Sequence, residues 1–338
     1  MDLHTAPTPT LPSLPAGGVR AVLEAAATAL RHDGGADMSA LALVLETAGS
    51  TYVRRGALAL FDAASLRAGW LSGGCLEPDI ALRARDVAQS GRIDWMDIDT
   101  RADEDLLSGS ALGCRGHLRM ALLPLRALAS WLPLLSQWCD GAGALHIDLR
   151  SDGTLTARIG DMHAHATLPA EALPWDGATS WTLQLPRPPS VAVFGAGPET
   201  PLLLPLLRSL GLFTTLVERR PRWRGHGTLA DHAIEMPPEQ ALAALSREYD
   251  AALVMHHHFE LDRETLAALA GSTIGFIGLL GPVRRREDLF RVLPPQVHQS
   301  LSARLHSPVG LDLGGHGPEA IALSIAAQLQ SHLYGPAT

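Results

Sequence analysis

Apolar and polar residues follow a mixed pattern through the first half of the chain. Short runs that are apolar throughout, or at every second position, predict strands, and apolar residues at helical spacing predict helices. Two of the strands are separated by Ser151–Asp152–Gly153, which is typical of a hairpin turn. We expect strands over residues 41–46, 57–61, 68–71, 92–99, 117–123, 145–150 and 154–159, and helices over residues 19–31, 77–89 and 125–138.

The second half has a more regular pattern, in which short apolar strands alternate with helices. Such alternation is typical of a parallel sheet with helical crossovers. The change follows Pro186–Arg187–Pro188–Pro189, which we interpret as a stiff linker. We expect strands over residues 191–194, 213–217, 251–255 and 273–279, and helices over residues 199–210 and 318–330.

These patterns predict an α/β protein with two domains. A length of 338 residues fits about two domains of ~150 residues each. A mixed α/β domain over residues 18–185 is followed by a linker at 186–190 and by a Rossmann-like parallel-sheet domain over 191–335. Residues 1–17, rich in proline and threonine, are expected to be a disordered lead.

Composition excludes several classes of function. The net charge of −8 argues against non-specific nucleic-acid binding. The chain contains no lysine, which excludes a standard P-loop and a Schiff-base lysine. Three cysteines without a Cys-x-x-Cys pair indicate no disulfide framework. No apolar run reaches membrane length and no signal-peptide pattern is present, so we expect a soluble cytoplasmic protein.

A glycine turn followed by a cysteine is the first candidate site. Gly73 and Gly74 precede Cys75, and the helix expected from Glu77 would place the sulfur near unpaired backbone N–H groups. Adjacent glycines permit a close approach to a ligand, and the start of a helix favours a thiolate. The alternative is a tight turn with a buried, unreactive cysteine.

A second glycine-flanked cysteine and a basic loop extend this candidate. Gly113, Cys114 and Gly116 repeat the pattern beside the strand expected at 117–123. The cysteines should therefore lie on the same edge of the N-terminal sheet if they share a site. A loop rich in glycine, serine and threonine ends in Arg54–Arg55 and is suited to an anion, although arginine pairs are also common on solvated surfaces.

The second domain has a partial dinucleotide fingerprint. Gly195-x-Gly197 follows the first strand, and Glu218 ends the second strand, where an acidic residue would bond a ribose hydroxyl. Thr200 replaces the third small residue, which weakens the prediction of a cofactor. Three histidines at 256–258 end a later strand, and they suggest either a metal site or a local polar cleft.

The order of these motifs resembles that of the XdhC/CoxI family, the maturation factors of xanthine dehydrogenase and carbon monoxide dehydrogenase. The resemblance spans residues 40–330 or so. It rests on Arg54–Arg55–Gly56, Ser72–Gly73–Gly74–Cys75–Leu76–Glu77, Gly113–Cys114–Arg115–Gly116, Val193–Phe194–Gly195–Ala196–Gly197, Phe276–Ile277–Gly278–Leu279–Leu280–Gly281, Ser307–Pro308–Val309–Gly310 and Pro318–Glu319–Ala320–Ile321–Ala322.

The resemblance implies an accessory protein and not an enzyme. Such proteins bind molybdenum cofactor (molybdopterin), protect it for sulfuration by a cysteine desulfurase, and deliver it to a molybdenum hydroxylase of the xanthine dehydrogenase type. It also implies a homodimer, with Cys75 and Cys114 contacting molybdenum through the cofactor, and soft thiolates suit such a centre. The candidate cofactor-binding residues are Arg54, Arg55, Ser72, Gly73, Gly74, Cys75, Glu77, Gly113, Cys114, Gly116, Gly195, Gly197, Glu218 and His257.

Departures from the family pattern concentrate in the Rossmann-like half. Pro198 stands where a histidine is usual, Glu218 replaces an aspartate, and of the three histidines only His257 matches the family's Thr-His-Asp. Two other functions therefore remain open. One is an NAD(P)-dependent oxidoreductase that uses the Rossmann-like domain, and the other is a cofactor-free scaffold that docks the desulfurase and the target enzyme.

Overall fold

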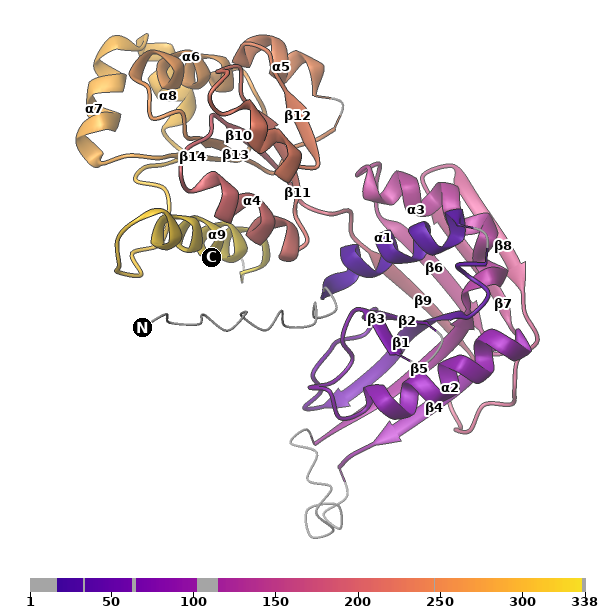
Figure 1. Ribbon diagram of the computed structural model, residues 1–338. Helices are drawn as coiled ribbons and strands as arrows, with labels where there is room; N and C mark the ends of the chain where they lie inside the picture. The colour runs from indigo at the N-terminus through magenta and orange to yellow at the C-terminus, as the bar shows by residue number, and fades with distance from the viewer. Residues whose placement is uncertain (1–16, 33, 63–64, 102–114, 246, 336–338) are drawn as a thin grey trace, which may run out of the picture. The chain divides into compact units, whose positions relative to one another are not determined.

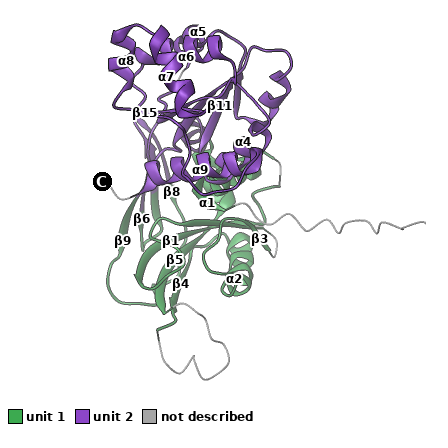
Figure 2. Ribbon diagram, turned by 90° about the vertical axis from the view of Figure 1, so that its left-hand side faces the viewer, with its two compact units in different colours: residues 1–132, 149–155, 166–183 green, residues 133–148, 156–165, 184–338 purple. Residues whose placement is uncertain are grey.

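The structure is a computed structural model that describes residues 17–32, 34–62, 65–101, 115–245 and 247–335 (Figure 1). Within it the chain divides into two compact units, which Figure 2 distinguishes by colour. Unit 1 comprises residues 1–132, 149–155 and 166–183, and unit 2 comprises residues 133–148, 156–165 and 184–338.

The five-stranded sheet of unit 1 is antiparallel and has the order β3-β2-β1-β5-β4. Its central strand places Ala40, Ala42 and Val44 on one face, as the alternation of side chains in a strand requires. The apolar side of α2 packs there, and α1 packs against β2 and β3. The elements are α1 (Gly18–Arg31), β1 (Ser39–Gly49), β2 (Leu58–Asp62), β3 (Ser65–Ala68), α2 (Glu77–Ser90), β4 (Asp94–Asp99) and β5 (Gly116–Pro124).

A helical stretch and a four-stranded sheet follow in sequence. The sheet has the order β8-β7-β6-β9, which confirms the hairpin expected across Ser151–Gly153. The helix expected at 125–138 is a 3₁₀ segment followed by an α-helix, with non-helical dihedral angles at Leu128. The elements are η2 (Leu125–Trp131), α3 (Leu132–Cys139), β6 (Leu145–Arg150), β7 (Thr154–Ile159), β8 (Met162–Thr167) and β9 (Ser180–Leu185).

The six-stranded sheet of unit 2 is wholly parallel, with the order β12-β11-β10-β13-β14-β15. Its central strand β10 directs Val191 and Val193 toward α4 and α9, and Ala192 and Phe194 toward α5, α6, α7 and α8 (Figure 1). Two helical layers therefore cover the sheet, and the expected Rossmann-like domain is confirmed.

The elements of this unit place their loops at the carboxyl edge of the sheet. They are β10 (Ser190–Phe194), α4 (Thr200–Ser209), β11 (Phe213–Val217), η3 (Arg224–Leu229), β12 (His232–Ile234), α5 (Pro238–Ala244), β13 (Ala251–Val254), α6 (Phe259–Ala270), β14 (Phe276–Leu279), α7 (Val283–Val292), α8 (Pro295–Leu301), β15 (Leu305–His306) and α9 (Pro318–Tyr334).

The strand expected at 68–71 is wrong. Strand β3 ends at Ala68, because Gly69 adopts a φ of +82° and a Cβ atom there would lie 2.4 Å from the carbonyl oxygen of Leu58. The chain then turns away and forms the bends that precede α2. Strands β8, β9, β12 and β15 and helices α5 to α8 were not expected from the sequence pattern.

Candidate functional site

The glycine turn before α2 is held by a buried carboxylate. Glu77 is 6% exposed, and its Oε1 accepts the backbone N–H groups of Leu71, at 3.0 Å, and Ser72, at 2.8 Å. The Ser72 hydroxyl donates to Oε2 of Glu77, and its oxygen accepts the amides of Gly74 and Leu76. Ser72 and Glu77 thus form a clamp that fixes the path of residues 71–77.

This clamp determines the ionisation of Glu77. Burial raises the pKa of Glu77, but the hydrogen bonds from the hydroxyl and amide of Ser72 and from the amide of Leu71 outweigh that effect. The pKa therefore lies below its ordinary value, and Glu77 is a carboxylate at neutral pH. Ser72 and Glu77, expected to bind cofactor, use their polar atoms to hold the loop.

The clamp presents Cys75 to solvent. Cys75 is exposed and is not in a disulfide, so the alternative of a buried cysteine is wrong. A Cβ atom at Gly73 or Gly74 would meet nothing within 4 Å, and Gly74 has a φ of +102° that favours glycine. The thiol therefore lies at an open, glycine-lined turn directly before a helix.

A narrow crevice lies beside the thiol within unit 1. Its volume is about 20 Å³, which is room for about one water molecule. Gly116 forms part of its wall, and a Cβ atom there would lie 2.5 Å from the carbonyl oxygen of Ser50. The lining residues are Ser50, Thr51, Tyr52, Leu71, Ser72, Cys75, Leu76, Ile98, Thr100, Gly116 and Leu118.

The basic loop only partly joins this site. Its first residues line the crevice, whereas Arg54 and Arg55 lie further along the loop, outside the lining. Arg55 donates to the carbonyl oxygen of Thr182 at 2.9 Å, and Arg54 is exposed. Gly113 and Cys114 lie outside the described residues, so a pocket shared by Cys75 and Cys114 stays a prediction.

In unit 2, the partial fingerprint forms the expected turn after β10. Gly195 has a φ of +90°, and a Cβ atom there would lie 2.6 Å from the backbone nitrogen of His256. The amide of Gly197 donates to the hydroxyl of Thr200 at 2.9 Å. In a dinucleotide site such an amide donates to the pyrophosphate. Here the Thr200 hydroxyl accepts the Gly197 amide, so this donor is not available to a dinucleotide.

The acidic residue at the end of β11 is also engaged. Oε2 of Glu218 accepts the amide of Ala196 at 2.8 Å, and Oε1 accepts the amide and Nε of Arg220 at 2.8 and 2.9 Å. Burial raises the pKa of Glu218, but the bonds from Arg220 and Ala196 lower it below its ordinary value. The carboxylate that would bond a ribose is occupied by Arg220.

A further carboxylate occupies the start of α4. Glu199 is 2% exposed, and its Oε1 lies 3.1 Å from Nε2 of His257, which has a φ of +53°. The hydrogen bond to Glu199 raises the pKa of His257 above its ordinary value, against the opposing effect of burial. A negative charge at this helix start opposes a pyrophosphate, which favours the same position. The residues therefore do not fit a dinucleotide.

The first of the three histidines belongs to a buried network that the sequence reasoning missed. Nδ1 of His256 lies 3.1 Å from Oδ1 of Asp262 on α6, and Nε of Arg285 on α7 lies 3.1 Å from Oδ2. Asp262 follows His256 by six residues and Arg285 is distant in sequence, so no local spacing indicated the group. His256 and His257 point to separate partners, and residues 256–258 form no group arranged to hold a metal ion within the described part of the chain.

These groups surround a cavity of about 490 Å³ at the carboxyl edge of the parallel sheet. Open α/β sheets bind ligands at this edge. The described lining residues are Ala196, Pro198, Glu199, Arg220, Arg222, Trp223, His256, His257, His258, Gly317, Pro318 and Ile321.

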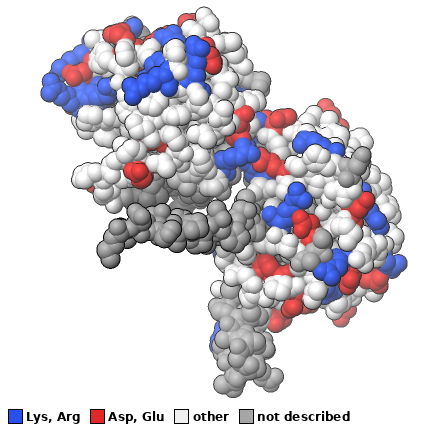
Figure 3. Space-filling view, viewed as in Figure 1, with Lys and Arg blue, Asp and Glu red and all other residues white. Residues whose placement is uncertain are grey.

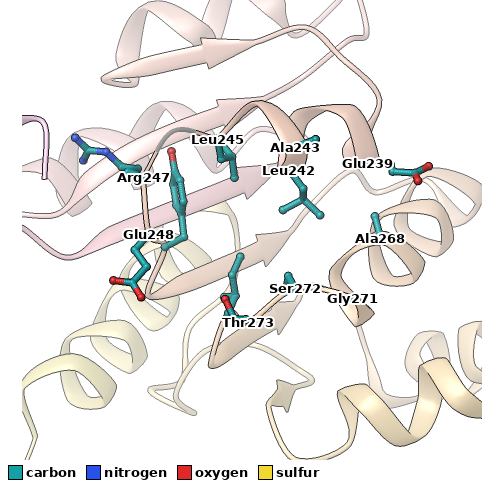
Figure 4. Close-up of a pocket in the computed structure, with 12 residues that line it drawn as sticks. Glu239, Leu242, Ala243, Leu245, Arg247, Glu248, Ala268, Gly271, Ser272 and Thr273 are labelled. Carbon is teal, nitrogen blue, oxygen red and sulfur yellow. The ribbon is translucent and has the colours of Figure 1, made fainter. Parts of the chain in front are cut away.

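Other surface features of unit 2 are less suited to a ligand. A cavity of about 580 Å³ between the ends of α5 and α6 lies at the amino edge of the sheet, where Glu239, Glu248 and Arg247 surround it (Figure 4). Positive side chains gather over α7 in Figure 3, but an acidic side chain lies among them, since Asp288 forms an ion pair with Arg291 at 3.1 Å. The carboxyl-edge cavity is therefore the stronger candidate in this unit.

Two absences apply to the part of the chain that the structure describes. In those residues, no group of three or more His, Cys, Asp or Glu side chains is arranged to hold a metal ion. No helix in the described ranges has the length and apolar character needed to cross a membrane.

Comparisons with known proteins agree with this organisation. Residues 34–98 match the XdhC and CoxI family, and residues 191–329 match the XdhC Rossmann domain. A Bacillus subtilis protein described as a probable subunit of xanthine dehydrogenase is 29% identical over 316 residues, which cover 86% of this chain and 91% of that protein. The uncharacterized Escherichia coli protein YqeB is 38% identical over 69 residues, which cover 20% of this chain and 13% of that protein.

A solved structure is similar over nearly the whole chain. It is described as a xanthine dehydrogenase from Bacillus halodurans, with a TM-score of 0.75 and 27% identity, covering 91% of this chain and 94% of that one. Since both family domains match in order along the sequence, the chain belongs to the XdhC/CoxI family.

Proposed function

We propose that this protein is an accessory factor in the maturation of a molybdenum hydroxylase of the xanthine dehydrogenase type. In this proposal it binds molybdenum cofactor, protects it while a cysteine desulfurase supplies sulfur, and delivers it to the hydroxylase as a homodimer. Family membership and the descriptions of the relatives support the class of function. We propose no reaction for the chain itself.

The observation that carries the proposal is the exposed thiol of Cys75 on a loop held by Ser72 and Glu77. A sulfur donor that is accessible and fixed in place fits a molybdenum–dithiolene centre, because soft ligands suit soft metal centres. The space around Gly73 and Gly74 admits a group to the thiol. The crevice beside it has room for only about one water molecule, so in this proposal the cofactor contacts the exposed thiol and does not enter the crevice.

Each residue of the site then has a defined role. When bound, the cofactor supplies the molybdenum centre that the hydroxylase uses. Cys75 contacts that end, and the clamp keeps the loop in one conformation, which lowers the entropic cost of binding. Arg54 is exposed and suits a phosphate oxygen, whereas Arg55 is already bonded to Thr182.

The test compares two cysteine variants. The wild type, Cys75→Ala and Cys139→Ala are purified anaerobically from a molybdenum-replete host, and molybdenum and pterin are measured per protein chain. Cys139 is a suitable control because it is also a cysteine but is less exposed than Cys75. We expect Cys75→Ala to retain at least tenfold less cofactor, whereas Cys139→Ala retains the wild-type amount.

Two results would contradict the proposal. Absence of cofactor from the folded wild type would exclude binding, and equal retention by Cys75→Ala would exclude the thiol. A variant without cofactor that still captures the desulfurase and the hydroxylase would instead support the docking scaffold. The oxidoreductase alternative has no support from the geometry, because Arg220 and Glu199 occupy the positions that a dinucleotide would use.

A further inference from the structure

The cavity between the ends of α5 and α6 has an apolar floor that belongs to the core of unit 2. Its volume of about 580 Å³ falls within the range of ~300–1,000 Å³ common for binding sites. Tyr249 and Ile274 line it and are 9% and 5% exposed. Leu242 and Leu245, which also line it, are partly buried and pack against the same core. The apolar surface of the cavity is therefore formed by the folded chain itself.

Arg247 lines this cavity, but its positive charge is engaged elsewhere. Its guanidinium carbon lies 3.3 Å from the centre of the Phe213 ring, and Nη2 donates to the carbonyl oxygen of Cys139 at 3.3 Å. Figure 4 shows the guanidinium directed away from Leu242 and Ala243. The positive charge is therefore held against the body of unit 2 and not over the apolar lining.

Two carboxylates lie at the rim. Glu248 is 84% exposed, and its Oε2 lies 3.7 Å from Nη2 of Arg187, which makes a weak surface ion pair. Glu239 is exposed, and no residue that the structure describes forms a hydrogen bond or ion pair with its side chain. Figure 4 shows Glu239 and Glu248 at opposite ends of the cavity. Negative charge is therefore available at both ends of an apolar surface.

The carbonyl groups at the end of α6, beside the cavity, are already satisfied. Nη1 of Arg304 donates to the carbonyl oxygens of Ser272 and Ile274 at 2.7 and 2.8 Å. Its Nη2 donates to those of Leu269 and Ala270 at 3.1 and 3.0 Å. The helix end therefore does not attract a cation, and the two rim carboxylates lie too far apart in Figure 4 to share one small ion.

We propose that this cavity is a docking groove for a segment of a partner protein in which an apolar side chain stands between basic residues. The apolar side chain contacts Leu242, Leu245 and Ile274. Arginine or lysine side chains on either side of it approach Glu239 and Glu248, and such charge complementarity favours both encounter and specificity.

The charge of the whole chain also favours a basic partner, because a net charge of −8 attracts positively charged segments over a distance. The inference goes beyond the proposed function, since it concerns unit 2 alone and involves neither Cys75 nor a cofactor.

The experiment uses three labelled synthetic peptides and the full-length protein. The first has leucines at its centre and two arginines on each side. The second has glutamate in place of every arginine, and the third has serine in place of every leucine. Binding is measured by fluorescence anisotropy at low salt, where charges are weakly screened. We expect the first peptide to bind at least about tenfold more tightly than either of the others.

Variants locate the binding. We expect Glu239→Gln/Glu248→Gln to weaken binding of the first peptide about fivefold through the loss of both rim charges. Glu235→Gln/Glu260→Gln is the matched control, because it removes the same charge from exposed carboxylates of unit 2 outside the cavity lining. Its affinity should stay within about twofold.

Ala243→Arg tests the groove in a second way. Ala243 is exposed on α5 and lines the cavity, so the new side chain adds bulk and positive charge at an open position and leaves the core unchanged. We expect this variant to weaken binding about tenfold. It should retain molybdenum cofactor like the wild type, so a failure of the cofactor proposal and a failure of this one are distinguishable.

Four results would overturn the inference. The first is no binding of the arginine peptide to the folded wild type at millimolar concentration. The second is equal affinity for the arginine and glutamate peptides. The third is full affinity in both Ala243→Arg and Glu239→Gln/Glu248→Gln. The fourth is a dimer in sedimentation velocity that Ala243→Arg dissociates, because a second copy of the chain would then cover the groove.

Discussion

The clamp at Glu77 leads to a prediction about both stability and thiol reactivity. Replacing Glu77 by alanine removes the acceptor of three donors, which are the amides of Leu71 and Ser72 and the hydroxyl of Ser72. Leu71 and Ser72 are buried, so these donors do not gain water freely in the native loop. Either they remain unsatisfied, or residues 71–76 open.

The magnitude follows from the number of donors. A buried donor without a partner costs about 1–3 kcal/mol. With some relief by water, we expect Glu77→Ala to lower the free energy of unfolding by about 3 kcal/mol. Glu77→Gln keeps one acceptor oxygen for the two amides but cannot accept from the Ser72 hydroxyl, and we expect about 1.5 kcal/mol.

The free energy of unfolding is measured by urea denaturation, with the unfolding of unit 1 as the signal. Hydrogen exchange of the Leu71 and Ser72 amides measures how far the loop opens locally. The reaction rate of Cys75 with a thiol reagent should rise in Glu77→Ala as the loop opens. Asp79→Ala is the control, because Asp79 lies in the same first turn of α2 but is exposed. It should change stability by less than about 0.5 kcal/mol.

The contribution of Glu77 to stability depends on pH in a definite direction. A carboxylate with a lowered pKa stabilises the fold above its ordinary value of 4.5, and this stabilisation is lost as the pH falls through the folded-state pKa. The stability difference between wild type and Glu77→Gln should therefore be full at pH 7 and shrink below about pH 4.5. Unchanged stability and unchanged amide exchange in Glu77→Ala would refute the reasoning.

Two further predictions concern unit 2. Gly195→Ala should destabilise the protein by about 2–4 kcal/mol in thermal unfolding, because its φ is +90° and its Cβ atom would clash with His256; Gly225→Ala, with open space around it, should have little effect. Glu199→Gln should lower the pKa of His257 measured by NMR titration, because the bond to Glu199 raises it. The pair of His257 and Glu199 stabilises the fold below pH 6.5, and its contribution is lost as the pH rises through the raised pKa of His257. An identical His257 titration in the wild type and in Glu199→Gln would contradict the pairing.

The sequence predicted the elements whose periodicity was strong. The parallel sheet of unit 2 was expected from the alternation of strands and helices, a helix was expected directly after the glycine turn and Cys75, and both are confirmed. Strand β12 was missed because it is short and mostly exposed, and α7 was missed because it is dominated by charged residues. A strand of three residues is too short to show a period, and α7 has too few apolar residues to indicate a helix.

The candidate site was harder to predict, because a motif does not show which way its polar atoms turn. Ser72 and Glu77 were expected to bind cofactor, yet their oxygens hold the loop. Arg285 on α7 shares the Asp262 carboxylate with His256, but α6 and β14 separate the two residues in sequence, and only the folded sheet brings them together. Burial and partner choice are tertiary properties, which spacing alone does not encode.

The bond between Arg220 and Glu218 lowers the affinity for any ligand that would bind the Glu218 carboxylate. A ligand that needs the Glu218 carboxylate must compete with a guanidinium of the same chain, which is present at a very high local concentration. If the state with Arg220 displaced is higher in free energy by about 2.7 kcal/mol, only about 1% of the molecules can bind, and the apparent affinity is about a hundredfold weaker. Replacing Arg220 would release Oε1 of the carboxylate, but Oε2 would still accept the amide of Ala196, and Thr200 and Glu199 would still oppose a dinucleotide.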